Sequence, residues 1–182
     1  MVEHRTRVMI TAPSSGIGRE TTLIFASSNI DAVLISRSAD KLATVADTAT
    51  IIRVKAKNYV VNLVNVSWVK EKMRQIVFDF GNIDILASNT GMVYTATLSQ
   101  KPLSGWQQVI DLNLTRAFGC IQRILLSMRQ KNRGKIVNVA SIHSQQALAN
   151  WAAYSVNFSD AALLPKQAVV DKLTLMLSPG VV

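Results

Sequence analysis

The chain has 182 residues, of which 49% are hydrophobic and 17% are charged, and this composition is typical of one globular domain rather than of a disordered segment. Residues 1–7 contain no apolar signal core, and no apolar run reaches the roughly 18 residues that a membrane span requires, so we expect no membrane partner. The single cysteine, Cys120, excludes an internal disulfide. A cytoplasmic location is therefore the default expectation, although an organelle is also compatible with the sequence.

The basic residues outnumber the acidic ones, twenty to eleven, and give a formal net charge of +9. They form separate short clusters, at 55–57, 70–72 and 129–135, with little aromatic interleaving. A nucleic-acid surface usually gathers such residues into one patch, so we interpret them as a solvated basic surface and do not expect nucleic acid as a partner. No group of His, Cys, Asp and Glu has metal-ligand spacing, and we predict no metal.

Short apolar runs of strand length alternate with segments of helical length. The expected strands are 7–10, 32–36, a segment within 51–63, 83–87 and 135–139, and the expected helices are 19–28, 40–49, 67–80, 104–128 and 154–177. Five such units predict an α/β fold with a doubly wound parallel sheet and helices on both faces, a Rossmann-like three-layer sandwich. Ligands are expected beyond the carboxyl ends of the strands. The helix at 104–128 has too many apolar positions for one narrow stripe, so we expect burial along two faces.

The stretch 11–18, with the sequence Thr-Ala-Pro-Ser-Ser-Gly-Ile-Gly, joins the first expected strand to the first expected helix. A helix N-terminus presents unpaired N–H groups and partial positive charge, and glycines let a phosphate approach the backbone. The stretch therefore predicts a phosphate site. Because Ala12 precedes Pro13, we expect an extended backbone with negative φ at Ala12.

Five features follow one another along the chain: the turn at 11–18, the sequence Asp-Ile-Leu-Ala-Ser-Asn-Thr-Gly at 84–91, Asn113, Ser141 and, thirteen residues later, Tyr154. Together they resemble the short-chain dehydrogenase/reductase family over nearly the whole chain. The resemblance implies a Rossmann-type oxidoreductase that acts on a small carbonyl or alcohol substrate with a nicotinamide cofactor. In the family the chain continues into a substrate-binding lobe, and we expect residues 1–182 to form a single dinucleotide-binding domain without that lobe.

The resemblance also implies a set of cofactor-binding positions. In the family's glycine-rich turn the last two glycines match Gly16 and Gly18, and Ala12 replaces the first. Family members that prefer NAD usually have an acidic residue after the second strand, where this chain has Arg37. A guanidinium binds a 2′-phosphate bidentately, so NADP(H) is favoured over NAD(H), unless Arg37 only ends a strand on a basic surface. The full expected set is Ser14, Ser15, Gly16, Ile17, Gly18, Ser36, Arg37, Asn62, Asn89, Thr90 and Gly91.

For catalysis, the resemblance implies that Tyr154 exchanges a proton with the substrate oxygen, that Ser141 polarises this oxygen, and that Asn113 holds a water in the proton relay. The family has a lysine four residues after the tyrosine, and here that position is Phe158. A nearby cation typically shifts a pKa by about 1 to 3 units, so its loss is expected to slow the proton step about tenfold to a thousandfold.

Three functions are compatible with these features. The first is an NADP(H)-dependent short-chain reductase or dehydrogenase, the second is a non-catalytic nucleotide-binding relative, and the third is a truncated form that acts through association. A homo-oligomer through the long helices is expected.

Three further residues have two possible interpretations each. We favour His143 as a surface residue over an acid or base, Cys120 as a small buried hydrophobe over a nucleophile, and Trp151 as a packing residue over a ligand-stacking one.

Overall fold

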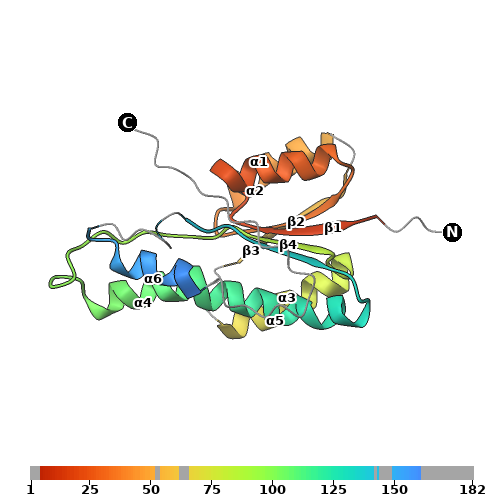
Figure 1. The fold of residues 1–182 in the computed structure, drawn as a ribbon. Helices are drawn as coiled ribbons and strands as arrows, with labels where there is room; N and C mark the ends of the chain where they lie inside the picture. The colour runs from red at the N-terminus through yellow and green to blue at the C-terminus, as the bar shows by residue number, and fades with distance from the viewer. Residues whose placement is uncertain (1–4, 52–53, 62–65, 142, 144–148, 161–182) are drawn as a thin grey trace.

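The computed structural model describes residues 5–51, 54–61, 66–141, 143 and 149–160, with the backbone alone for residues 51, 66–70 and 157–160. Its elements in chain order are β1 (Arg7–Thr11), α1 (Gly16–Ser27), β2 (Asp31–Ser36), α2 (Ala39–Ile51), β3 (Ala56–Val60), α3 (Val66–Phe80), β4 (Ile85–Ser88), α4 (Leu103–Ile110), η1 (Asp111–Thr115), α5 (Arg116–Gln130), β5 (Lys135–Asn138) and α6 (Ala152–Asp160). The strands form one parallel sheet in the order β3-β2-β1-β4-β5. The doubly wound α/β fold expected from the sequence is confirmed (Figure 1).

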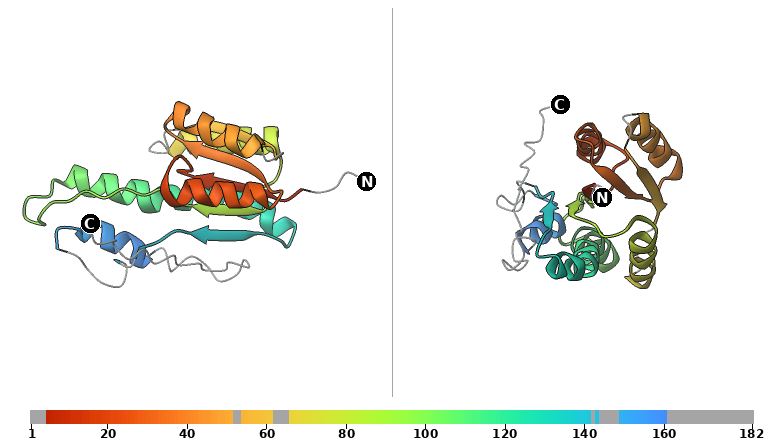
Figure 2. Two further views of the ribbon diagram at one scale, coloured as in Figure 1. Left: turned by 90° about the horizontal axis from the view of Figure 1, so that it is seen from above. Right: turned by 90° about the vertical axis from the view of Figure 1, so that its right-hand side faces the viewer.

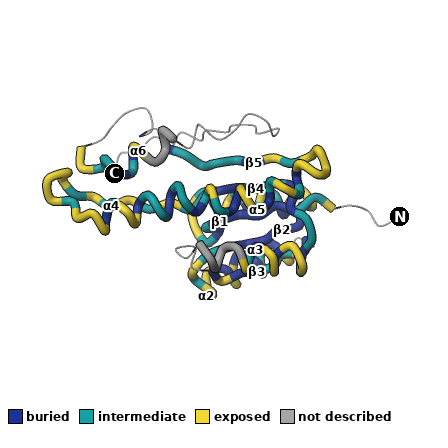
Figure 3. Tube along the Cα trace, turned by 90° about the horizontal axis from the view of Figure 1, so that it is seen from below, coloured by how far each residue is buried: buried dark blue, intermediate teal, exposed yellow. Residues whose placement is uncertain are grey.

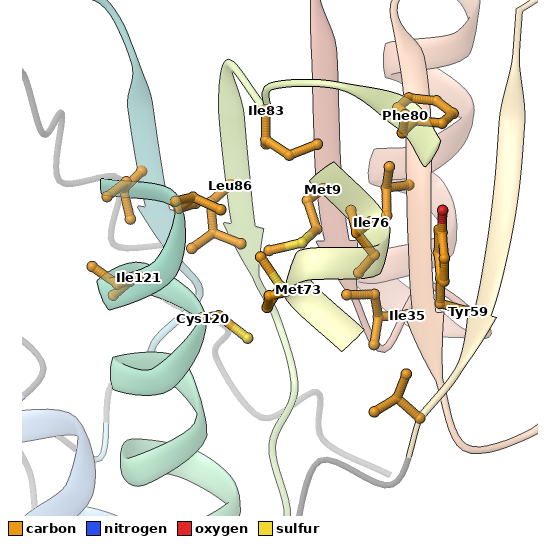
Figure 4. Packing of buried hydrophobic residues seen from close by; sticks show 14 of the residues in the cluster. Met9, Ile35, Tyr59, Met73, Ile76, Phe80, Ile83, Leu86, Cys120 and Ile121 are labelled. Atoms are coloured by element: carbon orange, nitrogen blue, oxygen red, sulfur yellow. The ribbon is translucent and has the colours of Figure 1, made fainter. Parts of the chain in front are cut away.

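Helices cover both faces of the sheet, and an apolar core lies on each face. The side chains of β1 point alternately into one core and the other. Met9 contributes to the larger core, which includes residues of α3 and α5, and Figure 4 shows this packing. Val8 and Ile10 contribute to a second core with residues of α2. All three side chains are fully buried, which is the pattern of a central parallel strand. Figure 3 shows the buried central strands and the exposed outer sides of the helices.

The topology places a crevice at the carboxyl edge of the sheet. From β1 the chain moves to β2 and β3 on one side, and β4 and β5 lie on the other side. The strand order therefore reverses between β1 and β4, and ligands of open α/β sheets bind beyond the strand ends at such a reversal. The segments that follow β1, β2, β4 and β5 all meet at this edge.

The long helix predicted for residues 104–128 is present as one helical run, formed by α4, η1 and α5. Its middle turn, η1, is a π-helix, which the periodicity did not predict. Figure 2 shows the run extending past the sheet, and α6 packs against both α4 and η1. In α5 the face toward the sheet is buried, whereas Phe118 and Leu126 are exposed in the isolated chain. None of the helices in the described ranges has the length and apolar character needed to cross a bilayer.

Candidate cofactor and catalytic site

The turn after β1 is tied to the end of β4 by side-chain hydrogen bonds. The backbone N–H groups of Asn89 and Thr90 donate to Thr11 Oγ1 at 2.9 Å and 3.0 Å. In the other direction, Asn89 Nδ2 donates to the carbonyl oxygen of Ala12 at 3.1 Å. These contacts bring the turn at 11–18 and the segment at 89–91 together, as the expected cofactor set requires.

Ala12 lies in the left-handed region, with φ of +51°, so the prediction of a negative φ is wrong. Two tertiary hydrogen bonds hold Ala12 in this conformation and override the preference for an extended backbone that Pro13 imposes on the residue before it. The Ala12 N–H donates to the Ile35 carbonyl at 2.8 Å, and the Ala12 carbonyl accepts from Asn89. A non-glycine residue in this region costs roughly 1–2 kcal/mol, so the glycine that the family has at this position would fit the turn better.

The two glycines of the turn have different physical roles. At Gly18 an added Cβ would clash with the Ala12 carbonyl oxygen and lie 2.5 Å from Asn89 Nδ2, so this position must remain without a side chain. At Gly16 the backbone has φ of +52°, and an added Cβ would meet no atom within 4 Å. The space beside Gly16 is therefore open at the point where α1 begins.

The first turn of α1 fits an anionic group. Its N-cap residue, Ser15, makes no side-chain capping hydrogen bond, and the first turn contains no acidic residue. Within the described part of the chain, neither the N-cap side chain nor a first-turn carboxylate therefore occupies the N-terminal N–H groups at the positive end of the helix dipole. The residues present fit the pyrophosphate of a dinucleotide, with Ser14 to Gly18 as the groups that would hold it.

The remaining expected cofactor residues lie at the ends of neighbouring strands. Ser36 is the last residue of β2, and its Oγ accepts a long hydrogen bond of 3.4 Å from the Ser38 N–H. Arg37 follows it and is exposed, and Gly91 is exposed after β4. Asn62 lies outside the described residues.

Arg116, which the sequence interpretation did not single out, lies at the start of α5 and is only 6% exposed. It lines a small pocket whose other residues are Thr11, Ser88, Thr90, Leu112, Ala117 and Cys120. Burial, followed by the nearby charge of Arg37, lowers the pKa of Arg116 to about 10, while Asp111 acts in the opposite direction. The guanidinium is therefore still charged at neutral pH. On the sequence it resembled any basic residue of an amphipathic helix, and no local signal marked it as buried.

Asn113 lies inside the π-turn η1 and is 8% exposed. Its Oδ1 accepts a hydrogen bond from the Met92 N–H at 2.8 Å, and its Nδ2 donates to the Met92 carbonyl at 3.0 Å. The amide therefore fixes the backbone of the segment that follows Gly91. The expected role of Asn113 in holding a water stays a prediction.

Ser141 and Tyr154 are linked through an aromatic cluster. Ser141 is 8% exposed, and its Oγ accepts a hydrogen bond from the His143 N–H at 3.3 Å. The His143 ring packs edge-on against Trp151, at 5.0 Å between centroids, and against Tyr154, at 6.2 Å. Trp151 and Tyr154 are 5.5 Å apart, so Trp151 packs as expected. His143 is 7% exposed, and its assignment to the surface is wrong because these rings cover it.

Two further expectations concern α6 and α5. The single helix α6 contains both Tyr154 and Phe158, so the two positions are one turn apart, although the Phe158 side chain is outside the described part. Cys120 is 1% exposed, and burial raises the pKa of its thiol to about 12, which confirms a small buried residue rather than a nucleophile. In the described ranges no three His, Cys, Asp or Glu residues are grouped to hold a metal.

Comparisons with known proteins identify the family. A family model described as short chain dehydrogenase matches residues 6–157. The chain belongs to the short-chain dehydrogenase family. A 3-oxoacyl-acyl-carrier-protein reductase, FabG, from Thermotoga maritima is 32% identical over 148 residues, which cover 80% of this chain and 60% of the relative. A D-beta-hydroxybutyrate dehydrogenase from Cupriavidus necator is 30% identical over 147 residues, covering 80% of this chain and 57% of the relative.

This short-chain dehydrogenase family member therefore spans 60% and 57% of the lengths of these two relatives. The crystal structure of an NAD+-bound xylitol dehydrogenase superimposes with a TM-score of 0.87 at 24% identity, covering 96% of this chain and 72% of that one. At this identity the superposition shows the shared fold.

Proposed function

We propose that the protein is an NADP(H)-dependent oxidoreductase that interconverts a carbonyl compound and a secondary alcohol. The observation that carries the proposal is that the α1 N-terminus, which has no side-chain cap, and the segment that holds Ser141 both lie at the carboxyl edge of the parallel sheet. The first feature suits a dinucleotide phosphate, and the second suits the substrate oxygen. Arg37, directly after β2, supports the choice of the phosphorylated cofactor.

In the proposed reaction the nicotinamide, when bound, supplies or accepts the hydride. The Tyr154 hydroxyl gives a proton to the substrate oxygen during reduction and takes one during oxidation. Ser141 Oγ accepts a hydrogen bond from the His143 N–H, so the Ser141 O–H can donate to the same substrate oxygen and stabilise its developing charge. Asn113 fixes the backbone at Met92, in the segment that follows Gly91.

Phe158 favours a second candidate function, a nucleotide-binding protein that does not catalyse hydride transfer. A tyrosine titrates near 10, and in the family the lysine at this position lowers the pKa of the tyrosine. Without that cation the Tyr154 hydroxyl is expected to exchange a proton with the substrate oxygen more slowly in both directions of the reaction. We therefore expect slow turnover of the natural sequence.

Two titrations and one matched pair of variants test the proposal. We expect NADPH to bind with a Kd in the micromolar range and NADH to bind more weakly, by calorimetry on the full chain. Phe158→Lys should raise the rate of NADPH oxidation with a carbonyl substrate by about tenfold to a thousandfold. Val156→Lys on the same helix, at a position that is 45% exposed, adds the same charge elsewhere and should leave the rate unchanged.

The outcomes separate the two candidates. Tyr154→Phe should remove turnover while NADPH affinity stays within about twofold, since the hydroxyl acts on substrate rather than on the phosphates. Binding of NADPH without turnover, in both the natural sequence and Phe158→Lys, would favour the non-catalytic function. Absence of binding of either nucleotide would overturn both.

A further inference from the structure

His143 contacts both of the residues whose hydroxyl groups the proposed function assigns to the substrate oxygen. It follows Ser141 by two residues and is only 7% exposed. Its backbone N–H donates to Ser141 Oγ at 3.3 Å, and its imidazole ring packs against the Tyr154 ring with 6.2 Å between centroids. The proposed function gives this buried ring no role of its own.

Ser141 and Tyr154 belong to different parts of the fold. Ser141 lies in the segment that follows β5, whereas Tyr154 lies in α6, which packs against α4 and η1. Proton transfer requires both hydroxyl groups within hydrogen-bond reach of one substrate oxygen, and a displacement of about 1 Å can slow a reaction about a hundredfold. A direct contact between the two parts would therefore keep the hydroxyl groups at a fixed separation, and the His143 ring makes one.

The rings of His143, Trp151 and Tyr154 form a cluster in which every pair is in contact. His143 and Trp151 are 5.0 Å apart at an interplanar angle of 67°, and Trp151 and Tyr154 are 5.5 Å apart at 84°. For His143 and Tyr154 the angle is 62°. Ring quadrupoles favour such edge-to-face pairs at separations of roughly 4.5–7 Å. A rotation of the Tyr154 side chain would break two of these contacts together, so the cluster restricts the direction of its hydroxyl group.

Two members of the cluster come from one end of α6. Trp151 directly precedes this helix, and its carbonyl accepts a hydrogen bond from the Ser155 N–H at 3.0 Å. Tyr154, three residues after Trp151, lies in the first helical turn, and residues at this spacing are neighbours on one face. His143 is the member from outside the helix. It therefore determines where the other two rings lie relative to Ser141.

We propose that His143 is a positioning residue for the reaction, whose ring holds the Tyr154 hydroxyl in place relative to Ser141. It acts through ring packing rather than through its nitrogen atoms. The inference rests on the proposed function, because it takes Tyr154 as the residue that exchanges a proton with the substrate. An aromatic side chain without nitrogen should therefore replace the imidazole, and a polar side chain without a ring should not.

Two substitutions at this position separate the ring from its nitrogen atoms. His143→Phe keeps a ring, His143→Gln keeps hydrogen-bonding groups, and both keep the backbone N–H that donates to Ser141. Each is made in the natural sequence and together with Phe158→Lys, in which faster turnover is expected. His143→Gln should lower kcat for carbonyl reduction about tenfold to a hundredfold and leave the KM for NADPH within about twofold. His143→Phe should recover kcat to within about threefold of its parent.

The side-chain rotamer of Tyr154 provides a readout that requires no turnover. Three-bond couplings in NMR spectra of tyrosine-labelled protein report whether a side chain occupies one χ1 rotamer or exchanges among several. Tyr154→Phe identifies the Tyr154 signal among the three tyrosines of the chain. Tyr154 should occupy one rotamer in the natural sequence and in His143→Phe, and several in His143→Gln. Tyr59, buried in β3, is the internal control and should keep one rotamer throughout.

Three results would overturn the inference. Equal loss of kcat in the two variants would assign the role to the imidazole nitrogens, and unchanged kcat in His143→Gln would mean that Tyr154 needs no support from this ring. A single Tyr154 rotamer in His143→Gln would mean that α6 alone fixes the side chain. If the larger phenyl ring prevents folding, as circular dichroism would show, His143→Gln still decides through the last two results. If no protein turns over, including Phe158→Lys, the proposed function fails, and the rotamer measurement decides whether His143 holds Tyr154.

Discussion

At the scale of single residues, Ala12 has a strained backbone conformation that two long-range hydrogen bonds hold in place. Its φ of +51° places Cβ close to the following carbonyl, yet its N–H and carbonyl hold Ile35 and Asn89 in place. Because both hydrogen bonds use backbone groups, any residue except proline can make them, and the conformational cost depends on the side chain. The strain is therefore separable from the function of the turn.

We predict that Ala12→Gly stabilises the protein by about 1 kcal/mol, because glycine adopts positive φ without the clash. The higher conformational entropy of glycine in the unfolded state cancels part of this stabilisation. Urea unfolding of the full chain measures this free energy. The same substitution at Ala43, an exposed position within α2, should have the opposite sign and cost about 1 kcal/mol, as glycine does in a helix interior. A loss of stability in Ala12→Gly would show that the backbone at this position is not strained.

At the scale of elements, the π-turn η1 determines where Asn113 lies. A π-turn inserts an extra residue into a helix and rotates the following residues relative to the preceding ones, and such turns are frequent at functional sites. Here it places the Asn113 amide against both backbone groups of Met92. The helix thereby supports a loop that contains no regular structure between β4 and α4.

Replacing Asn113 with alanine should destabilise the protein by about 1–3 kcal/mol, because it leaves the Met92 N–H and carbonyl without their partners. Amide hydrogen exchange at Met92 should become faster by a larger factor than exchange in the central strand β1. Gln107→Ala removes an exposed side-chain hydrogen bond to Asp111 on the same helical run and should change stability by less than about 0.5 kcal/mol. Unchanged exchange at Met92 in Asn113→Ala would contradict the positioning role.

The sequence predicts elements better than it predicts the environments of individual side chains. Periodicity and apolar runs identify the strands and the long helix because burial on both faces of a parallel sheet imposes them. The turn at 11–18 follows from its residue types. Neither the φ of Ala12 nor the burial of Arg116 and His143 could be derived in this way, since each depends on contacts with segments far away in the chain. A local preference, such as that of a residue before proline, is overridden when several long-range hydrogen bonds act together.

At the scale of the whole molecule, the formal net charge of +9 acts against the compact state. The ion pairs of the described residues offset little of it, because several of their side chains are well exposed, as in the pair of Lys57 and Asp79 at 2.8 Å. Repulsion between exposed charges extends over a Debye length, which falls from roughly 20 Å at 20 mM salt to below 10 Å at 300 mM. Screening should therefore stabilise this protein, whereas burial of the two apolar cores responds little to sodium chloride.

We predict that the melting temperature rises by a few degrees between about 20 and 300 mM sodium chloride at pH 7. A variant with glutamine at four exposed basic positions, Lys41, Arg74, Arg123 and Arg133, lowers the formal net charge from +9 to +5. It should melt at a higher temperature in low salt and should respond less to added salt, because less repulsion remains to be screened. A melting temperature that falls with salt in the natural sequence would mean that attractive pairs outweigh the net repulsion. An equal salt response in both proteins would attribute the effect to the salt's action on apolar surface instead.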